Sequence, residues 1–356
     1  MISPTAQSRP AARIVAILLP RFNMMSLISL MEPVRIANYL SSGTLYDTVT
    51  CAAEPGEVTA SNGTSVMCEG LPEKLGPDDL VLLIGSWGAE HHNDPKLLSW
   101  LRRADRQGIR QCAVEMAPYV FARAGLLAKR QATVHWAYLP GFQELFPDIL
   151  GTEQLFTIDG RVMTCAGSTA GLDFMLHLIR QDHGDALVGE ISDNILHHPV
   201  RDPLAPQRKS LGRGLDELPQ SVADAVEVMD QNLSEPVPVP ELAKRVGLSQ
   251  RQLERQFKRA VGCSVVQFGL LLRLQHARVL LISTDLGVRE IATASGFNSL
   301  SHFAYSFRKC FDRRPREYRQ AWPDNKEAPD WPGTLSAYLD TLKQAQGAPN
   351  VPDAAR

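Results

Sequence analysis

Short apolar runs alternate with amphipathic stretches over the first two hundred residues. Ile14–Leu19 and Leu80–Ile84 are uninterrupted apolar runs, closed by Pro20 and Gly85. Runs of this kind are typical of strands that are buried on both faces of a sheet. The pattern predicts two further strands, ending near 115 and 166, and three helices, at 23–40, 117–127 and 172–181. This order predicts an α/β fold for residues 13–200, with helices on both faces of a mostly parallel sheet.

Residues 221–322 follow a helical period throughout and contain an internal repeat. The segments Glu241–Gly247 and Glu290–Gly296 match as short helices that end in glycine, 49 residues apart. An apolar pair with i, i+4 spacing follows each of them, Leu253 with Phe257 and Phe303 with Phe307. Two copies of a helix, a turn and a second helix are therefore predicted, which is the helix-turn-helix arrangement in an all-α domain.

The second helix of each copy has a defined start and an exposed polar face. Ser249 is the predicted N-cap of the first, with Gln252 completing a capping box, and Ser299 is the predicted cap of the second. The polar faces carry Arg251, Arg255 and Lys258 in the first copy, and Ser301, His302, Tyr305, Arg308 and Lys309 in the second. Such side chains contact bases and phosphates in the major groove, so both faces are predicted to bind DNA.

One long helix is predicted between the two copies, over residues 264–282. At 1.5 Å per residue it is about 28 Å long. A spacer of this length suits two recognition helices that lie about 34 Å apart, one turn of DNA, so that both enter successive major grooves from one side.

Charge is distributed unevenly along the chain. The whole chain has a formal net charge of −2, which by itself argues against a nucleic-acid partner. Residues 241–320, however, contain 15 Lys and Arg against 6 Asp and Glu, a net charge of +9. The remainder has 22 basic and 33 acidic residues, a net charge of −11. The basic part coincides with the predicted DNA-binding helices, and the rest of the chain is acidic.

Three segments show no sustained periodicity. Residues 1–12 are predicted to be a disordered tail, and residues 201–220, with several prolines and charges, a linker. Residues 323–356 are rich in Pro, Asp and Ala and are predicted to be a mobile tail with one short helix near 335–343. The predicted domains are therefore 13–200 and 221–322.

The cysteines and the apolar runs indicate the compartment. The six cysteines form no Cys-x-x-Cys pair and are too widely spaced for a disulfide framework or a zinc site. No uninterrupted apolar run reaches the roughly 20 residues of a membrane helix. Residues 1–13 lack the apolar core of a signal peptide. We expect a cytoplasmic protein with no membrane association, metal or cofactor.

Two motifs in the helical part carry a family resemblance. They are Gly-Phe-Asn-Ser-Leu-Ser-His-Phe at 296–303 and Phe-Arg-Lys-Cys-Phe-Asp-Arg-Arg-Pro-Arg-Glu-Tyr-Arg at 307–319. Through them residues 233–322 closely resemble the DNA-binding module of the AraC/XylS family of bacterial transcription regulators. The resemblance implies base contacts from Arg251, Glu254 and Arg255 in the first recognition helix, and from Ser301, His302 and Tyr305 in the second. Glu254 would accept a hydrogen bond from a cytosine amino group or brace a neighbouring arginine.

Five segments of the first part carry another resemblance: Glu32–Asn38, Ala124–Leu127, Ala132–Trp136, Leu139–Phe142 and Thr164–Asp173. Through them residues 13–200 are similar to the DJ-1/PfpI branch of the class I glutamine-amidotransferase-like fold, as it occurs fused to AraC-type modules. The resemblance implies a flavodoxin-like sheet and a sharp turn where catalytic relatives present a nucleophilic cysteine. Its register places Glu115 at that turn and Ser29 at the position of the acidic partner. No histidine follows Cys165 as an amidotransferase base, so thiol chemistry is not expected.

A fold that lacks its nucleophile suggests a retained pocket at the carboxyl ends of the strands. The residues expected there are Glu32, Ser86, Trp87, Glu115, Met116, His135 and Trp136. Two carboxylates and two tryptophans suit a small cation, because a Trp face attracts ammonium groups and a carboxylate neutralises them. The resemblance is closest to regulators that sense arginine, carnitine, glycine betaine or related amines and implies the same class. Alternatively, His135 or Trp136 packs in the core, and Glu32 pairs with Arg35.

The residues and the resemblances favour a DNA-binding transcription regulator, an activator, controlled by a small cationic effector. A double-stranded DNA operator, RNA polymerase and a second copy of the chain in a homodimer are the expected partners. One alternative is an amidase- or hydrolase-like first domain, which would need Cys112 or Cys165 as nucleophile, and neither has an evident base. Another is a first domain that acts mainly in dimerisation.

Overall fold

The computed structural model describes residues 11–207 and 218–321. The chain divides into two compact units, residues 1–207 and residues 208–356, called here the sheet unit and the helical unit. The predicted disordered segment 1–12, most of the predicted linker and the predicted tail 323–356 with its short helix lie outside the described residues.

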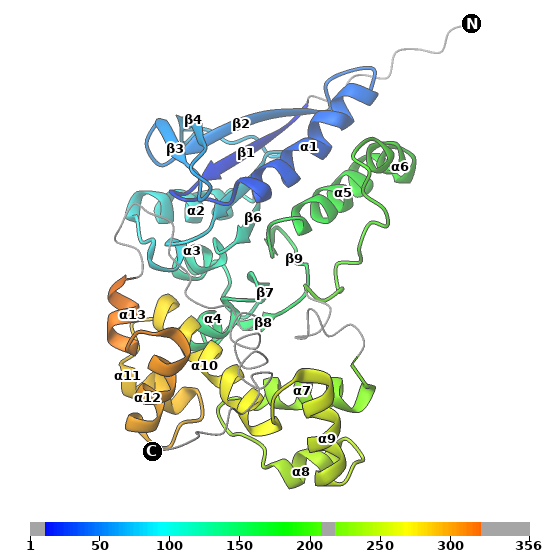
Figure 1. The fold of residues 1–356 in the computed structure, drawn as a ribbon. Helices are drawn as coiled ribbons and strands as arrows, with labels where there is room; N and C mark the ends of the chain where they lie inside the picture. The colour runs from blue at the N-terminus through cyan, green and yellow to red at the C-terminus, as the bar shows by residue number, and fades with distance from the viewer. Residues whose placement is uncertain (1–10, 208–217, 322–356) are drawn as a thin grey trace, which may run out of the picture. The chain divides into compact units, whose positions relative to one another are not determined.

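The sheet unit contains an eight-stranded sheet in the order β3-β4-β2-β1-β5-β6-β10-β9 (Figure 1). Its six central strands, from β4 to β10 in this order, run parallel, and β3 and β9 add antiparallel edges. The strands are β1 Ala12–Leu18, β2 Tyr46–Ala52, β3 Gly56–Thr59, β4 Ser65–Gly70, β5 Leu80–Gly85, β6 Arg110–Glu115, β9 Phe156–Asp159 and β10 Val162–Cys165. A separate parallel pair consists of β7 Gln131–Thr133 and β8 Leu150–Thr152.

Helices cover both faces of the sheet, as predicted. Alternate strand residues such as Ile14 and Leu82 share one apolar cluster with α1, α5 and α6. The residues between them, such as Val15 and Leu83, are equally buried, and Figure 1 shows α1 and α2 on opposite sides of the sheet. The helices of this unit are α1 Met24–Leu40, η1 Ala89–His91, α2 Pro95–Arg106, α3 Pro118–Arg123, α4 Leu139–Leu145, α5 Ala170–His183 and α6 Asp185–Asn194.

The first part of the predicted linker belongs to the sheet unit instead. Residues 201–207 lie against it: Arg201 bonds to Asp173, and the backbone N–H of Gln207 donates to the Glu153 carbonyl at 3.0 Å. The sequence of this segment has no periodicity because its contacts come from single side chains and isolated backbone bonds rather than from a helix or strand.

The helical unit consists of seven helices over its described residues. They are α7 Gln220–Gln231, α8 Val239–Arg245, α9 Gln250–Val261, α10 Val265–Ser283, α11 Val288–Ala294, α12 Leu300–Phe311 and α13 Pro315–Ala321. The repeat is confirmed, because α8 and α9 are joined through Gly247, and α11 and α12 through Gly296, both glycines having positive φ. The predicted capping box of Ser249 and Gln252 forms, and Ser299 caps α12.

The spacer helix α10 is the common core element of the helical unit. It contacts α7 and α9 of the first half and α11, α12 and α13 of the second. Among the described residues, α10 is the one helix that is long and apolar enough to cross a membrane, judged by length and composition alone. Its apolar side chains, Phe268, Leu272 and Leu280 among them, are buried inside the unit, which accounts for that composition.

Candidate functional site

Glu115 lies at a strained turn between β6 and α3. Its φ is 63°, in the left-handed region that non-glycine residues rarely adopt, and 6% of its surface is exposed. Gly167, after β10, is packed against it: a Cβ on Gly167 would lie 2.5 Å from the Cβ of Glu115. The predicted sharp turn is therefore present, with a carboxyl side chain enclosed by the next loop.

Two serine hydroxyls hold the Glu115 carboxyl group. Ser26 of α1 donates to Oε2 at 2.7 Å, and Ser86, after β5, donates to Oε1 at 2.9 Å. Burial raises the pKa of Glu115, and the hydrogen bonds from Ser26, Asn23 and Ser86 partly oppose that rise. The side chain is thus a buried acid that is stabilised by neutral donors.

The loop after β7 lies against the same turn. The backbone N–H of His135 donates to the Glu115 carbonyl at 3.1 Å. Burial lowers the pKa of His135 to about 4, so its imidazole is neutral at pH 7. Trp136 follows with 40% of its surface exposed. His135 therefore contacts the turn through its backbone, and Trp136 stands beside it with one side in solvent.

The structure brings together Ser86, Glu115 and His135 from the predicted pocket. Trp87 is the half-buried neighbour of Ser86, and Met116, next to Glu115, is fully buried. We call this surrounding group, with Ser26, the elbow site; its members are Ser26, Ser86, Trp87, Glu115, Met116, His135 and Trp136.

Three residues of α1 bear on the predicted pocket. Glu32 pairs with Arg35 on its own helix, with Nη2 of Arg35 2.5 Å from Oε1, so the alternative weighed for it describes this structure. Ser26, which the sequence analysis missed, is the α1 residue that contacts Glu115; Ser29 lies beside Gly171 instead. The sequence did carry a signal for Ser26. It is the third residue of α1 after the cap Asn23, so it lies in the first turn of the helix, close to the carboxyl end of β1.

Neither candidate cysteine of the sheet unit is fit for nucleophilic chemistry. Cys112 and Cys165 are fully buried in β6 and β10. Burial raises the pKa of Cys112 well above its ordinary value and that of Cys165 to about 12. A thiol that stays protonated at neutral pH is a poor nucleophile.

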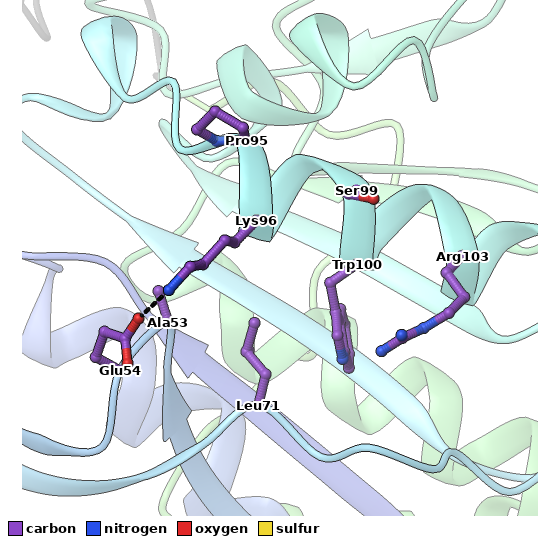
Figure 2. Close-up of a pocket in the computed structure, with 8 residues that line it drawn as sticks. All are labelled: Ala53, Glu54, Leu71, Pro95, Lys96, Ser99, Trp100 and Arg103. Carbon is purple, nitrogen blue, oxygen red and sulfur yellow. Dashed lines mark hydrogen bonds and ion pairs between the residues drawn. The ribbon is translucent and has the colours of Figure 1, made fainter.

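An open hollow lies elsewhere on the sheet unit and shares no residue with the elbow site. Figure 2 shows it between α2 and the loops after β2 and β4, with Lys96 paired to Glu54 at 2.7 Å. Both partners of this pair are about three-quarters exposed, so the pair lies in solvent and is worth little energetically. The hollow is lined by Ala53, Glu54, Leu71, Pro95, Lys96, Ser99, Trp100 and Arg103.

The candidate DNA-contacting side chains lie on the outer faces of α9 and α12. Leu253 and Phe257 of α9, and Phe303 and Phe307 of α12, are completely buried, so each helix is fixed in rotation. Glu254 accepts a hydrogen bond from Gln250 at 2.9 Å. The exposed faces carry the predicted residues Arg251, Glu254, Arg255 and Lys258 on α9, and Ser301, His302, Tyr305, Arg308 and Lys309 on α12.

Partly buried polar contacts connect the second helix-turn-helix unit to the rest of the helical unit. The Arg273 guanidinium of α10 donates to the Gly296 carbonyl at 2.9 Å and lies 4.8 Å from the centre of the Phe297 ring. Arg319 of α13 donates to the Leu281 carbonyl near the end of α10 and to the Leu286 carbonyl in the loop that follows it. These bonds position α11 and α12 against the spacer helix.

Each of the two units matches a known protein family. Residues 14–181 match the DJ-1/PfpI family, and residues 242–321 match a helix-turn-helix domain. The HTH-type transcriptional regulator CdhR of Pseudomonas aeruginosa is 36% identical, over 90% of this chain and 96% of its own length. The chain belongs to this family of regulators.

Other members of the family match over nearly their whole length as well. The HTH-type transcriptional regulator GbdR of Pseudomonas aeruginosa is 35% identical over 96% of this chain and 95% of its own length. The HTH-type transcriptional regulator GlxA of Rhizobium meliloti is 33% identical over 90% of this chain and 99% of its own length. The chain is therefore a sequence-specific DNA-binding transcription regulator with a DJ-1/PfpI sheet unit and an AraC-type helical unit, and not an enzyme.

Proposed function

We propose that the sheet unit binds a small cationic amine at the elbow site and that this effector controls transcription through the helical unit. Arginine, carnitine, glycine betaine and related amines are the proposed class. The observation that carries the proposal is Glu115, an acid in the place of the expected nucleophile, buried and hydrogen-bonded by neutral serine hydroxyls.

A buried carboxyl group of this kind favours a cationic ligand. Burial disfavours its charged form, and the hydrogen bonds that its side chain accepts come from serine and asparagine, which carry no charge. A cation placed against it in a low-dielectric site would favour the ionised form and gain a strong, charge-assisted interaction. Binding of the effector would therefore lower the raised pKa of Glu115.

The aromatic residues support the same class. Trp87 and Trp136 each stand one residue from a group that bonds to Glu115, the Ser86 hydroxyl and the His135 backbone N–H. A quaternary ammonium group, which cannot donate hydrogen bonds, is recognised by aromatic faces combined with a carboxylate.

Calorimetry on the full-length protein tests the effector class. The wild type is titrated with arginine, glycine betaine and carnitine, and so is Glu115→Gln, which keeps the shape and removes the acid. We expect one of these amines to bind the wild type and Glu115→Gln to bind it about tenfold more weakly or worse, the effect of losing one charged contact of roughly 1.4 kcal/mol.

Glu54→Gln is the matched control, because it removes an equally sized carboxylate from the exposed pair with Lys96. It is expected to bind the amine as the wild type does. Binding of an anion or a sugar, with none of the three amines bound, would refute the cationic class.

The remaining parts of the proposal concern partners and cellular context. We propose that the protein acts in the cytoplasm as an activator, that it contacts RNA polymerase beside a double-stranded operator, and that it forms a homodimer when bound. Of the predicted domain limits 13–200 and 221–322, we propose to keep 13, 221 and 322 and to move the end of the first domain from 200 to 207. In vitro transcription from a promoter carrying the operator distinguishes activation, in which transcript increases with effector, from repression.

A further inference from the structure

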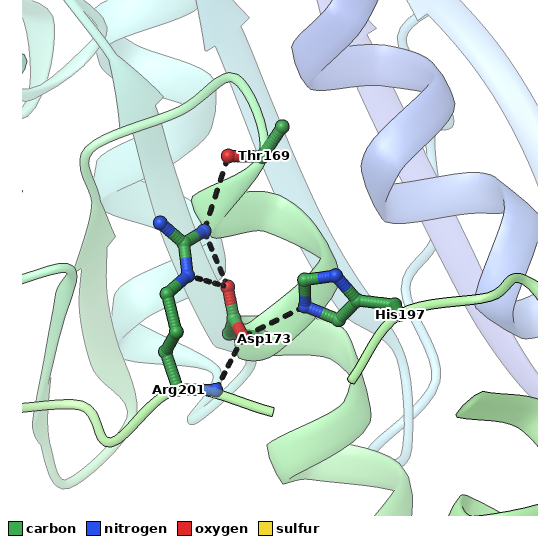
Figure 3. Close-up of polar contacts among 4 residues, drawn as sticks. All are labelled: Thr169, Asp173, His197 and Arg201. Carbon is green, nitrogen blue, oxygen red and sulfur yellow. Dashed lines mark hydrogen bonds and ion pairs between the residues drawn. The ribbon is translucent and has the colours of Figure 1, made fainter. Parts of the chain in front are cut away.

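Two side-chain attachments hold the segment after α6 against the sheet unit, beside backbone hydrogen bonds that join it to Glu153 and Leu155. We call residues 197–207 the strap. Its first attachment is Asp173 of α5, whose side chain is completely buried (Figure 3). The Arg201 backbone N–H donates to Oδ1 of Asp173 at 2.7 Å, and its guanidinium donates to Oδ2 at 2.6 and 2.9 Å. His197 completes the group, with Nε2 2.9 Å from Oδ1.

The second attachment is the side chain of Gln207. Its Oε1 accepts a hydrogen bond from the backbone N–H of Trp136 at 2.8 Å. Its Nε2 donates to Thr133 Oγ1 and to the Val134 carbonyl, both at 2.9 Å. One amide thus bonds to the last residue of β7 and to two residues of the loop that follows it, and a surface linker would not require such a set of contacts.

Each attachment lies next to a group that contacts the elbow site. On the Arg201 side, Thr169 Oγ1 accepts from Nη2 of Arg201 at 3.1 Å, and its neighbour Ser168 donates its backbone N–H to Ser26 Oγ at 2.7 Å. Ser26 in turn donates to Glu115.

On the Gln207 side, the connection is equally short. His135 donates its backbone N–H to the Glu115 carbonyl, and the next residue, Trp136, donates to Gln207. The two attachments of the strap therefore meet the elbow site through two different loops, one after β10 and one after β7.

We propose that the strap transmits the occupancy of the elbow site toward the DNA-binding unit, an inference that rests on the proposed ligand site. A ligand against Glu115 changes the charge and the hydrogen bonds at Ser26 and at the loop of His135. Thr169 and Trp136 belong to these loops. A shift of either loop therefore alters the hydrogen bonds of Arg201 or of Gln207. The strap ends at Gln207, directly before the chain enters the helical unit. Coupling of this kind requires a contiguous set of contacts that both sites bias.

Hydrogen exchange tests the first half of the inference without any ligand. Exchange of backbone amides is measured on full-length wild type, Glu115→Gln and the control Glu54→Gln. In Glu115→Gln we expect the amides of Trp136, Arg201 and Gln207 to exchange several-fold faster or slower than in the wild type, with β1 and β5 unchanged. Exchange that changes at Ser168 and His135 but not in the strap would overturn the inference.

Gln207→Glu tests the second half, since it keeps the shape and removes the two donors of the amide. Its matched control is Gln143→Glu, whose amide donates only to the Gly151 carbonyl at 3.5 Å. The operator is selected from a random-sequence pool with the wild-type protein. Operator affinity is then measured with and without the amine that binds in calorimetry. We expect Gln207→Glu to bind the amine within about twofold of the wild type and to lose the amine's effect on operator affinity.

The outcomes separate the strap from the ligand site. If Gln207→Glu retains the amine's effect on DNA binding, the strap does not transmit it. If it loses amine binding too, Gln207 belongs to the ligand site and the inference is wrong. If no amine binds the wild type, the proposed effector class fails, and the exchange experiment alone decides on the strap.

Discussion

Glu115 carries the argument about the sheet unit at the scale of single residues. Its place in the chain was predicted from the register of the DJ-1/PfpI resemblance, and the positive φ of 63° confirms the sharp turn there. The position of Ser26 in the first turn of α1 was a usable signal, but the hydrogen bonds themselves join Glu115 to residues 89 and 29 positions away in the sequence, so no local pattern predicts them. Local patterns give the turn, whereas the partners of its side chain depend on how the strands are ordered.

The raised pKa of Glu115 predicts a pH-dependent loss of stability. The folded protein holds this proton more tightly than the unfolded chain does, so its contribution is complete below the ordinary value of 4.5 and is lost as the pH rises through the raised pKa. Glu115→Gln has no such proton. We expect the variant to gain stability relative to the wild type as the pH rises from 4.5, measured by urea unfolding at several pH values.

Ser26→Ala is the companion to that prediction. It leaves Glu115 with one hydroxyl donor fewer and the Ser168 amide without its acceptor, and we expect a loss of about 1–3 kcal/mol in unfolding free energy. If the stability difference between Glu115→Gln and wild type does not change with pH, Glu115 is not a buried acid with a raised pKa.

In the helical unit, Gly296 occupies a turn with positive φ, as Glu115 does in the sheet unit. Its φ is 72°, and a Cβ there would lie 2.4 Å from the Leu233 carbonyl oxygen. Gly296→Ala should therefore destabilise the helical unit by more than about 1 kcal/mol, because both strain and a backbone clash act against it. Gly189→Ala in α6, where no atom lies within 4 Å of the added Cβ, is the control and should cost little or add stability. The midpoints of thermal unfolding of both variants are compared with that of the wild type. Equal midpoints for Gly296→Ala and Gly189→Ala would contradict the prediction.

At the scale of elements, the strongest patterns were predicted well and the mixed ones were missed. The runs that became β1 and β5 are uniformly apolar and buried on both faces. β2 was missed because Asp47, Thr48 and Thr50 interrupt it, and several of its residues are exposed or half-buried. The helix predicted over 117–127 ends as α3 at Arg123, followed by Gly125 with a φ of 78°.

One missed element had a usable signal. α2 begins with Asp94 as N-cap and Pro95 in the first turn, and Asp94 accepts from the Lys96 backbone N–H. An acceptor cap followed by proline is a recognised helix start. The caps of α9 and α12, by contrast, could be predicted because the same pattern occurs in both copies of the repeat.

The recognition helices support a prediction of their own. Arg255 lies on the exposed face of α9, opposite the buried Leu253 and Phe257. If Arg255 contacts a base, Arg255→Ala should weaken operator binding by about 1–3 kcal/mol and relax the preference at one base position. Competition binding against operator variants measures both.

Arg102→Ala is the matched control, an exposed arginine of α2 in the sheet unit. It should leave operator affinity and base preference unchanged. An Arg255→Ala protein that binds weakly but with the base preference of the wild type would assign Arg255 to phosphate contact instead.

At the scale of the whole molecule, a basic segment and an acidic remainder explain a nearly neutral chain. The basic segment 241–320 has a net charge of +9 and lies in the helical unit, whereas the rest of the chain sums to −11. We expect a fragment of residues 208–356 to fold and to bind the operator with the same dependence on salt as the full chain, since the slope reports the phosphates that are neutralised. A much shallower slope for the fragment would show that the sheet unit also contacts DNA.

The division into two units was predictable from charge and periodicity, but the end of the first unit was not. Residues 201–207 are held where Arg201 bonds to Asp173 and where Gln207 bonds to Val134. Both contacts join a single side chain to a distant part of the chain. No local period marks such a segment, so its sequence resembles that of a linker.

Operator binding by the full-length protein as a function of amine concentration is the most direct test of ligand-controlled DNA binding through Glu115. The affinity for the selected operator is measured with arginine, glycine betaine and carnitine, on wild type and on Glu115→Gln. We predict that one amine changes the operator affinity of the wild type and that Glu115→Gln requires about tenfold more of it, or does not respond. Operator affinity that stays constant with every amine, or a response that Glu115→Gln shares in full, would contradict this.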